Sequence, residues 1–194
     1  MKNLDKKIIL IGASTGGPRL IEKICSSLPS DYKHTLCIVQ HMSESFLTTF
    51  AQRLDRMSSL NVYETKHNMK ILSSSIYLVR GGVHMHFSKD SEGNIVVSEE
   101  KNMGLSQFQP SIDEMMLSAL NIFDPKSIIA ILLSGIGDDG AKGMVEIKKN
   151  GGYTIGESQN SAIVYGMPKA AFENDGVSEQ LNFEDIIKKI LELK

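Results

Sequence analysis

The fold is decided by residues 8–18, which read IILIGASTGGP. The continuous apolar run Ile8–Ile11 is typical of a parallel strand whose two faces are both buried. Gly16 and Gly17 permit a tight turn, and Pro18 suits the first turn of a helix. The stretch therefore predicts a strand, a sharp turn and a helix, the unit from which parallel α/β sheets are built.

The same alternation continues outward from this stretch. Further strands are predicted at 36–39, 62–65, 76–79, 128–133 and 153–155, with apolar helical stripes between most of them. Two short segments, His84–Phe87 and Ile95–Val97, flank the turn signal Ser91–Asn94 and predict a hairpin. We expect a mainly parallel sheet with helices on both faces and an antiparallel edge hairpin.

Composition limits the class of protein. The 194 residues are 41% hydrophobic and fit one ordinary domain, so we expect a single domain over residues 1–194. A net charge of −2 gives no case for nucleic acid binding. The apolar runs are too short to span a bilayer, and no export segment follows Met1, which predicts a cytoplasmic protein that is not embedded in a membrane. Cys25 and Cys37 lie in apolar patterns and are expected to be buried free thiols.

Ser14 follows the first predicted strand within the pattern G-x-S-x-G. The glycines of this pattern allow a turn that exposes the serine hydroxyl. The helix that begins at Pro18 would direct backbone amides and its positive dipole end at the same point. This arrangement suits an oxyanion, but it suits a bound phosphate equally well. Ser14 alone thus predicts a nucleophile, a phosphate-binding turn or a purely structural glycine turn.

His41 and the pair Asp138-Asp139 also follow predicted buried strands. A histidine can take a proton from a serine hydroxyl, and a carboxylate can hold the imidazole in the required tautomer. An aspartate before a helix is also a common N-cap, and we expect one of the two to cap the helix that begins at Ala141. Taken together with Ser14, these residues are the parts of a catalytic triad.

Several motifs carry a resemblance to a known family. They are Ile11–Pro18, Val39–Met42, Phe50–Leu54, Pro110–Asp113, Gly137–Gly143 and Val164–Pro168. In this order they resemble the catalytic domain of the chemotaxis protein-glutamate methylesterases (CheB), over about residues 8–180.

The resemblance implies a three-layer α/β fold and a hydrolase that demethylates glutamyl γ-methyl esters on methyl-accepting chemoreceptors. Many members also deamidate receptor glutamines. Motif matching places the nucleophile at Ser14, the base at His41 and the acid at Asp139. No metal and no organic cofactor are implied, and the partner is the cytoplasmic helices of a receptor.

Further residues are expected to line the active site. They are Thr15, Gly16, Gly17, Ile136 and Gly137. The amides of Thr15–Gly17 or of Ile136–Gly137 are the candidates for an oxyanion hole. The family has methionine in place of Ile136 and His-Arg in place of Phe108-Gln109, which leaves substrate fit more open than chemistry.

Family members usually carry a receiver domain before the catalytic domain, and none is expected within these 194 residues. Two alternatives to the methylesterase remain. One is a freestanding hydrolase of another ester or amide, and the other is a regulatory module that binds phosphate at Ser14–Gly17 without catalysis.

Overall fold

The computed structural model describes residues 6–101 and 108–193. Its centre is a seven-stranded sheet in the order β3-β4-β2-β1-β7-β8-β9, with parallel pairing throughout. The strands are β1 (Ile8–Ala13), β2 (Thr35–Gln40), β3 (Asn61–Glu64), β4 (Ser75–Leu78), β7 (Ile128–Leu132), β8 (Tyr153–Glu157) and β9 (Glu179–Leu181). The strand β1, which contains the apolar run Ile8–Ile11, lies in the middle of the sheet.

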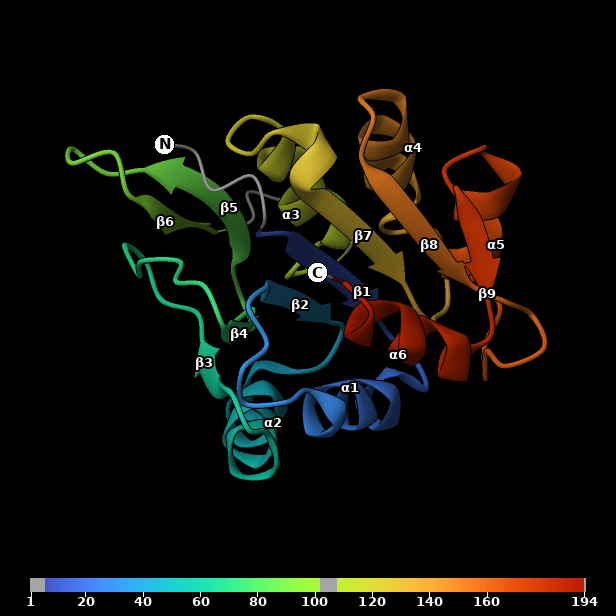
Figure 1. Cartoon of the computed structure of the whole chain (residues 1–194), viewed down its shortest axis with the longest axis horizontal. Coiled ribbons are helices and arrows are strands. Elements are labelled where there is room, and N and C mark those ends of the chain that lie inside the picture. Colours follow the sequence, from blue (N-terminus) through green and yellow to red (C-terminus); the bar gives the residue numbers. More distant parts are fainter. Residues whose placement is uncertain (1–5, 102–107, 194) are drawn as a thin grey trace.

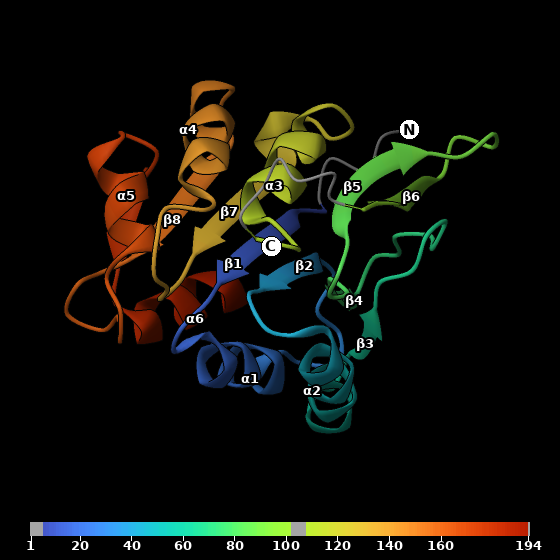
Figure 2. The same ribbon diagram turned by 180° about the vertical axis from the view of Figure 1, so that it is seen from behind.

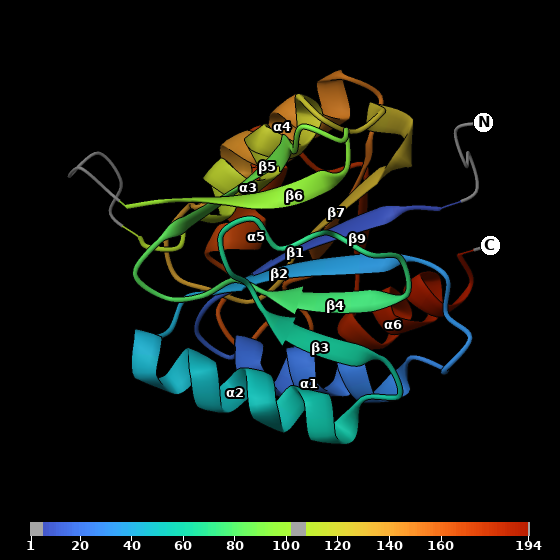
Figure 3. The same ribbon diagram turned by 90° about the vertical axis from the view of Figure 1, so that its left-hand side faces the viewer.

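Helices cover both faces of the sheet, as Figure 1 and Figure 3 show. One face carries α1 (Gly17–Ser27), α2 (Glu44–Met57) and α6 (Phe183–Leu191), and the other carries α3 (Ile112–Leu120), α4 (Ala141–Lys149) and α5 (Met167–Glu173). A short 3₁₀ turn, η1 (Pro125–Ser127), precedes β7. The predicted three-layer α/β arrangement is confirmed.

Alternating residues of β1 explain its continuous apolar run. Ile9 and Ile11 join the buried cluster that includes the side chains of α1, α2 and α6. Ile8 and Leu10 join the cluster that includes α3, α4 and α5. Because successive side chains of a strand point to opposite faces, a strand covered on both sides must be apolar at every position.

The predicted hairpin consists of β5 (His84–Lys89) and β6 (Ile95–Glu100), which pair antiparallel. It forms a separate two-stranded sheet and does not extend the seven-stranded ladder. Met85 and Phe87 are buried in the cluster that contains α3, and the Phe87 amide donates to Ser118 Oγ at 3.2 Å. This packing holds the hairpin over α3, beside the sheet (Figure 2).

The edge strand β9 was not predicted from the sequence. It has three residues, Glu179–Leu181, none of them buried, and so gives no apolar signal. Its pairing with β8 is visible only once the fold places the two together.

The register of the central strands sets the position of the polar residues that follow them. Ala13 of β1 is level with Gln40 of β2, and Gly12 is level with Leu132 of β7. The residues after β1, β2 and β7 therefore meet at one edge of the sheet, where parallel α/β folds bind their ligands.

Candidate active site

Ser14 stands in a tight turn between β1 and α1. Its amide donates to the carbonyl oxygen of Ser134 at 3.0 Å, and its own carbonyl accepts from the Gly17 amide at 2.9 Å. Gly16 has φ +88°, and a Cβ there would lie 2.9 Å from both Ile163 Cβ and Ser134 Oγ. Only glycine fits such a position without strain. The glycine of the motif therefore allows the sharp turn that leaves Ser14 half-buried.

His41 follows β2, the neighbour of β1, and its ring is bonded to Asp139. The distance from Nε2 to Asp139 Oδ2 is 2.8 Å, and the two side chains are only 8% and 7% exposed. The side chain of Gln40 ties the two segments together, since its Nε2 donates to the carbonyl oxygens of both Ser14 and His41 at 2.9 and 3.0 Å. The structure thus brings Ser14, His41 and Asp139 to neighbouring strand ends.

Asp139 is held ionised by the groups around it. It accepts from Ser111 Oγ at 2.8 Å and from the amides of Ile112 and Asp113 at 2.7 and 3.0 Å. Burial opposes ionisation, but the hydrogen bonds from His41, from the two amides and from Ser111 outweigh it and lower the pKa of Asp139.

An ionised carboxylate can only accept hydrogen bonds, so the proton between the two residues sits on His41 Nε2. The other ring nitrogen, Nδ1, is buried and has no hydrogen-bond partner among the described residues. Its lone pair is therefore free to accept a proton, which is the state that a general base requires.

The expected N-cap on α4 is wrong. The cap position is Gly140, with φ +95° and no side-chain cap, and Asp138 is exposed. The carboxylate of Asp139 instead binds the first amides of α3, while Asp113 of α3 accepts from the Gly143 amide of α4 at 2.7 Å. The start of α3 thus receives an aspartate from the loop before α4, and the start of α4 receives one from α3, because the two helices begin side by side at the same sheet edge.

Of the residues expected to line the site, Thr15–Gly17 follow Ser14 directly, and Ile136 and Gly137 follow Gly135, where an added Cβ would lie 2.7 Å from Ser14 Cβ. Thr15 and Ile136 are exposed, Ile136 by 61%. The Gly17 amide already donates to Ser14 O. The amides of Thr15, Gly16, Ile136 and Gly137 have no acceptor within the described residues. Both groups of candidate oxyanion donors therefore retain N–H groups that bond to nothing in the described part of the chain.

Four residues of the site were missed by the sequence reasoning. Ser134 Oγ donates to Thr15 O at 2.7 Å and accepts from the Val164 amide at 2.9 Å, which fixes the turn at Ser14. Ile163 is 65% exposed beside Gly16, and Ser111 binds Asp139. Phe108 stacks on the His41 ring with a centroid distance of 4.2 Å and an interplanar angle of 4°. Ser134 and Ile163 give no local signal because each acts on a residue distant in sequence. Ser111 lies in the motif Pro110–Asp113, but nothing in the sequence links it to Asp139. Phe108 differs from the family pattern in the sequence, but the sequence alone does not place it on His41.

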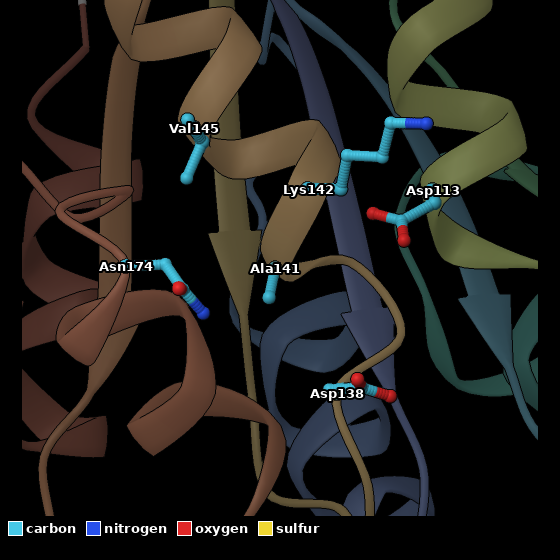
Figure 4. A pocket seen from close by; sticks show the side chains of 6 residues that line it. All are labelled: Asp113, Asp138, Ala141, Lys142, Val145 and Asn174. Carbon is cyan, nitrogen blue, oxygen red and sulfur yellow. The ribbon is translucent and has the colours of Figure 1, made fainter.

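A pocket of about 480 Å³ lies next to the loop that carries Asp139, and its walls include neither Ser14 nor His41. Its lining comprises Asp113, Asp138, Ala141, Lys142, Val145 and Asn174. Figure 4 shows Asp113 projecting from α3 and Asn174 lying near α5, on either side of the first turns of α4. Because the pocket lacks the reactive groups, we assign the chemistry to the strand ends instead.

The remaining titratable candidates are buried thiols and histidines that pair with residues outside the proposed triad. Cys25 and Cys37 are free and buried, and burial raises the pKa of Cys25 to about 12, which leaves an unreactive thiol. His84 Nδ1 accepts from the Ser111 amide, and His86 pairs with Glu100 and Glu114. In the described part of the chain, no group of three or more histidine, cysteine, aspartate or glutamate side chains is arranged to hold a metal ion. No described helix combines the length and apolarity needed to cross a membrane.

Comparison with known proteins gives a consistent result. Residues 9–190 match the family model described as CheB methylesterase. A protein-glutamate methylesterase/protein-glutamine glutaminase 2 of Carboxydothermus hydrogenoformans is 41% identical over 189 residues, 97% of this chain and 53% of that protein. A protein-glutamate methylesterase/protein-glutamine glutaminase of Caldanaerobacter subterraneus subsp. tengcongensis is 41% identical over 186 residues, 94% of this chain and 51% of that protein.

A solved structure agrees with these sequence matches. The crystal structure of the Thermotoga maritima CheB methylesterase catalytic domain superposes with a TM-score of 0.91 and 31% identity, covering 98% of this chain and 100% of that one. The chain spans about half the length of the curated relatives it matches.

Proposed function

The chain belongs to the CheB methylesterase family, and we propose that it acts as a single catalytic domain that hydrolyses glutamyl γ-methyl esters on chemoreceptor helices. The observation that carries the proposal is the buried pair of His41 and Asp139, at the strand end next to Ser14. A phosphate-binding turn has no need of a buried, oriented base. This pair therefore favours a hydrolase over the regulatory module.

The reaction proceeds by acyl transfer. Ser14 Oγ attacks the ester carbonyl while His41 Nδ1 takes the hydroxyl proton. Asp139, fixed by Ser111 and the amides of α3, keeps the ring in the Nε2–H tautomer and stabilises the imidazolium that forms. His41 then returns the proton to the departing methanol.

The glutamyl-serine intermediate is hydrolysed by the reverse steps. His41 takes a proton from water, the hydroxide oxygen attacks the acyl carbon, and Ser14 leaves with the proton that His41 returns. A glutamine side chain would form the same intermediate with loss of ammonia, so the same residues serve deamidation. The free amides at Thr15–Gly16 or Ile136–Gly137 receive the developing oxyanion.

The surface around Ser14 suits a protein substrate. Ile136 and Ile163 are 61% and 65% exposed. Ile163 lies against Gly16 of the turn that holds the serine, and Ile136 follows Gly135, where an added Cβ would lie 2.7 Å from Ser14 Cβ. A receptor helix that presents a modified glutamate could lay apolar side chains on these two residues. The cytoplasmic part of a receptor would be the partner, which places the reaction in the cytoplasm.

The test measures methanol release from methylated receptor membranes. The native chain should release methanol, Ser14→Ala should lower the rate by roughly a thousandfold or more, and His41→Ala should do the same. Ser26→Ala, which changes an exposed serine at the far end of α1, is the matched control and should leave the rate unchanged. Hydrolysis of small esters without any methanol release from receptors would point to another substrate. Full activity of Ser14→Ala would refute the proposed nucleophile.

A further inference from the structure

One hydrogen bond does not fix an imidazole ring. With the Cβ of His41 anchored to the backbone and Nε2 bonded to Asp139, the ring can still rotate about the line that joins these two atoms. Nδ1 lies off that line, so the rotation moves the very atom that must face the serine hydroxyl. A general base needs its lone pair within hydrogen-bond reach of the proton it accepts. Some other contact must therefore set the plane of the ring.

The ring of Phe108 supplies such a contact. The two rings are stacked at 4.2 Å between centroids and are parallel to within 4°. Any rotation of the imidazole about its Cβ–Nε2 line would tilt it out of this stack and lose contact with the aromatic face. Stacked aromatic pairs are worth enough to bias such a rotation strongly.

Phe108 is well placed to act as a fixed surface. It lies two residues before the buried Pro110 and three before Ser111, whose hydroxyl binds Asp139. The tip of its ring is 3.9 Å from the position that a Cβ of Gly137 would take, so it also borders the loop that carries Asp139. The same short segment thus holds the carboxylate through Ser111 and covers the ring through Phe108.

We propose that Phe108 is a positioning residue that sets the ring plane of His41 and thereby aims Nδ1 at Ser14. The inference rests on the proposed hydrolase function. Phe108 has no group that can donate or accept a proton, so it acts through His41 and takes no part in the chemistry itself. Where the family pattern has histidine at this position, this chain uses a purely apolar ring.

The kinetic test uses the full chain and p-nitrophenyl acetate, a small ester that makes little use of the receptor-binding surface. Phe108→Ala should lower kcat roughly three- to tenfold, the range expected for loss of an aromatic pair, with KM changed less than about twofold. Phe108→Tyr should restore kcat, and Phe108→Leu should fall between. Phe172→Leu removes an exposed ring on α5 and serves as the matched control, with no change expected.

A spectroscopic test reads the ring plane without any reaction. In NMR spectra, the ring protons of His41, assigned with His41→Ala, should lie upfield in the native chain and in Phe108→Tyr because they face an aromatic ring. They should move downfield in Phe108→Leu, which keeps the apolar volume and the fold. Comparison of Phe108→Tyr with Phe108→Leu shows whether the aromatic ring sets the plane of His41, even where Phe108→Ala does not fold.

Two results would overturn the inference. One is a Phe108→Leu variant with native kcat and unmoved His41 signals. The other is a rise in KM at constant kcat, which would make Phe108 a substrate contact. Failure of the hydrolase proposal is separate, because it would appear as absence of ester hydrolysis by the native chain, and failure of the nucleophile assignment as activity that survives Ser14→Ala.

Discussion

Two helices begin at the same edge of the sheet, and their first turns are treated in opposite ways. The amides that lead into α1, those of Thr15 and Gly16, have no acceptor within the described residues, and the cap position is a glycine. The first amides of α3 are taken up by the carboxylate of Asp139. Both helix ends attract negative charge. The α3 end holds the protein's own carboxylate, and the α1 end keeps its donors for an oxyanion formed in the reaction.

The largest loss of activity should come from changing Asp139, the carboxylate that binds the first amides of α3. The carboxylate of Asp139 accepts hydrogen bonds from three donors and from the His41 ring. Asp139→Asn replaces it with a neutral amide, which disturbs both the tautomer of His41 and the first turn of α3. Turnover of methylated receptors should fall by roughly 10³- to 10⁴-fold. Asp138→Asn changes the exposed neighbour and should stay within about twofold of the native rate. The reverse order in a receptor demethylation assay would reassign the acid.

A smaller loss of stability and activity should come from adding a side chain at Gly16, where the amides that lead into α1 have no acceptor within the described residues. Gly16→Ala adds a Cβ at φ +88° that would lie 2.9 Å from Ile163 Cβ and Ser134 Oγ. The cost should be roughly 2–3 kcal/mol of unfolding free energy, with activity lowered about tenfold because the Gly16 amide must move. Gly93→Ala has a similar φ of +81° with nothing within 4 Å and should cost only about 1 kcal/mol. Urea unfolding of the two variants measures the difference in unfolding free energy. Equal losses would show that the turn at Gly16 can shift to accommodate the added Cβ.

The smallest effect, on stability alone, should come from changing Asp113, the α3 aspartate that accepts from the Gly143 amide of α4. Burial and the charge of Asp139 raise the pKa of Asp113 to about 6, although the Gly143 amide acts against the shift. A carboxyl whose pKa is raised in the folded state loses its stabilising contribution as the pH rises through that value. At pH 8 the free energy of unfolding of Asp113→Asn should therefore exceed that of the native chain by on the order of 1 kcal/mol, after allowance for partial exposure. At pH 4 the two free energies should be equal. Denaturant unfolding at the two pH values checks the sign, and a gain at pH 4 alone would contradict it.

Most of the fold could be predicted because its signals are local. The run Ile8–Ile11 and its counterpart in β7 are apolar at every position, which only a doubly covered strand requires. The hairpin was also predicted, but not its place over α3, because Met85 and Phe87 look like ordinary strand residues until the helix is present. The strand β9 is too short and too exposed to be found.

The candidate site was only partly visible in the sequence. Ser14, His41 and Asp139 could be named because each follows a strong strand signal or matches a family motif. The exchange of caps between α3 and α4 could not be predicted, because Asp113 and Asp139 are 26 residues apart and the expected N-cap is a purely local rule. The stack of Phe108 on His41 likewise depends on segments that only the fold brings together.

In the proposed reaction, Ser14 forms the acyl intermediate. The most direct measurement is rapid-quench mass spectrometry of the chain mixed with methylated receptor membranes, reading the peptide that contains Ser14. We predict a transient glutamyl adduct on Ser14 whose formation keeps pace with the first turnover of methanol and which is absent from Ser14→Ala. Methanol release by the native chain with no adduct on this peptide, persisting in Ser14→Ala, would contradict the account.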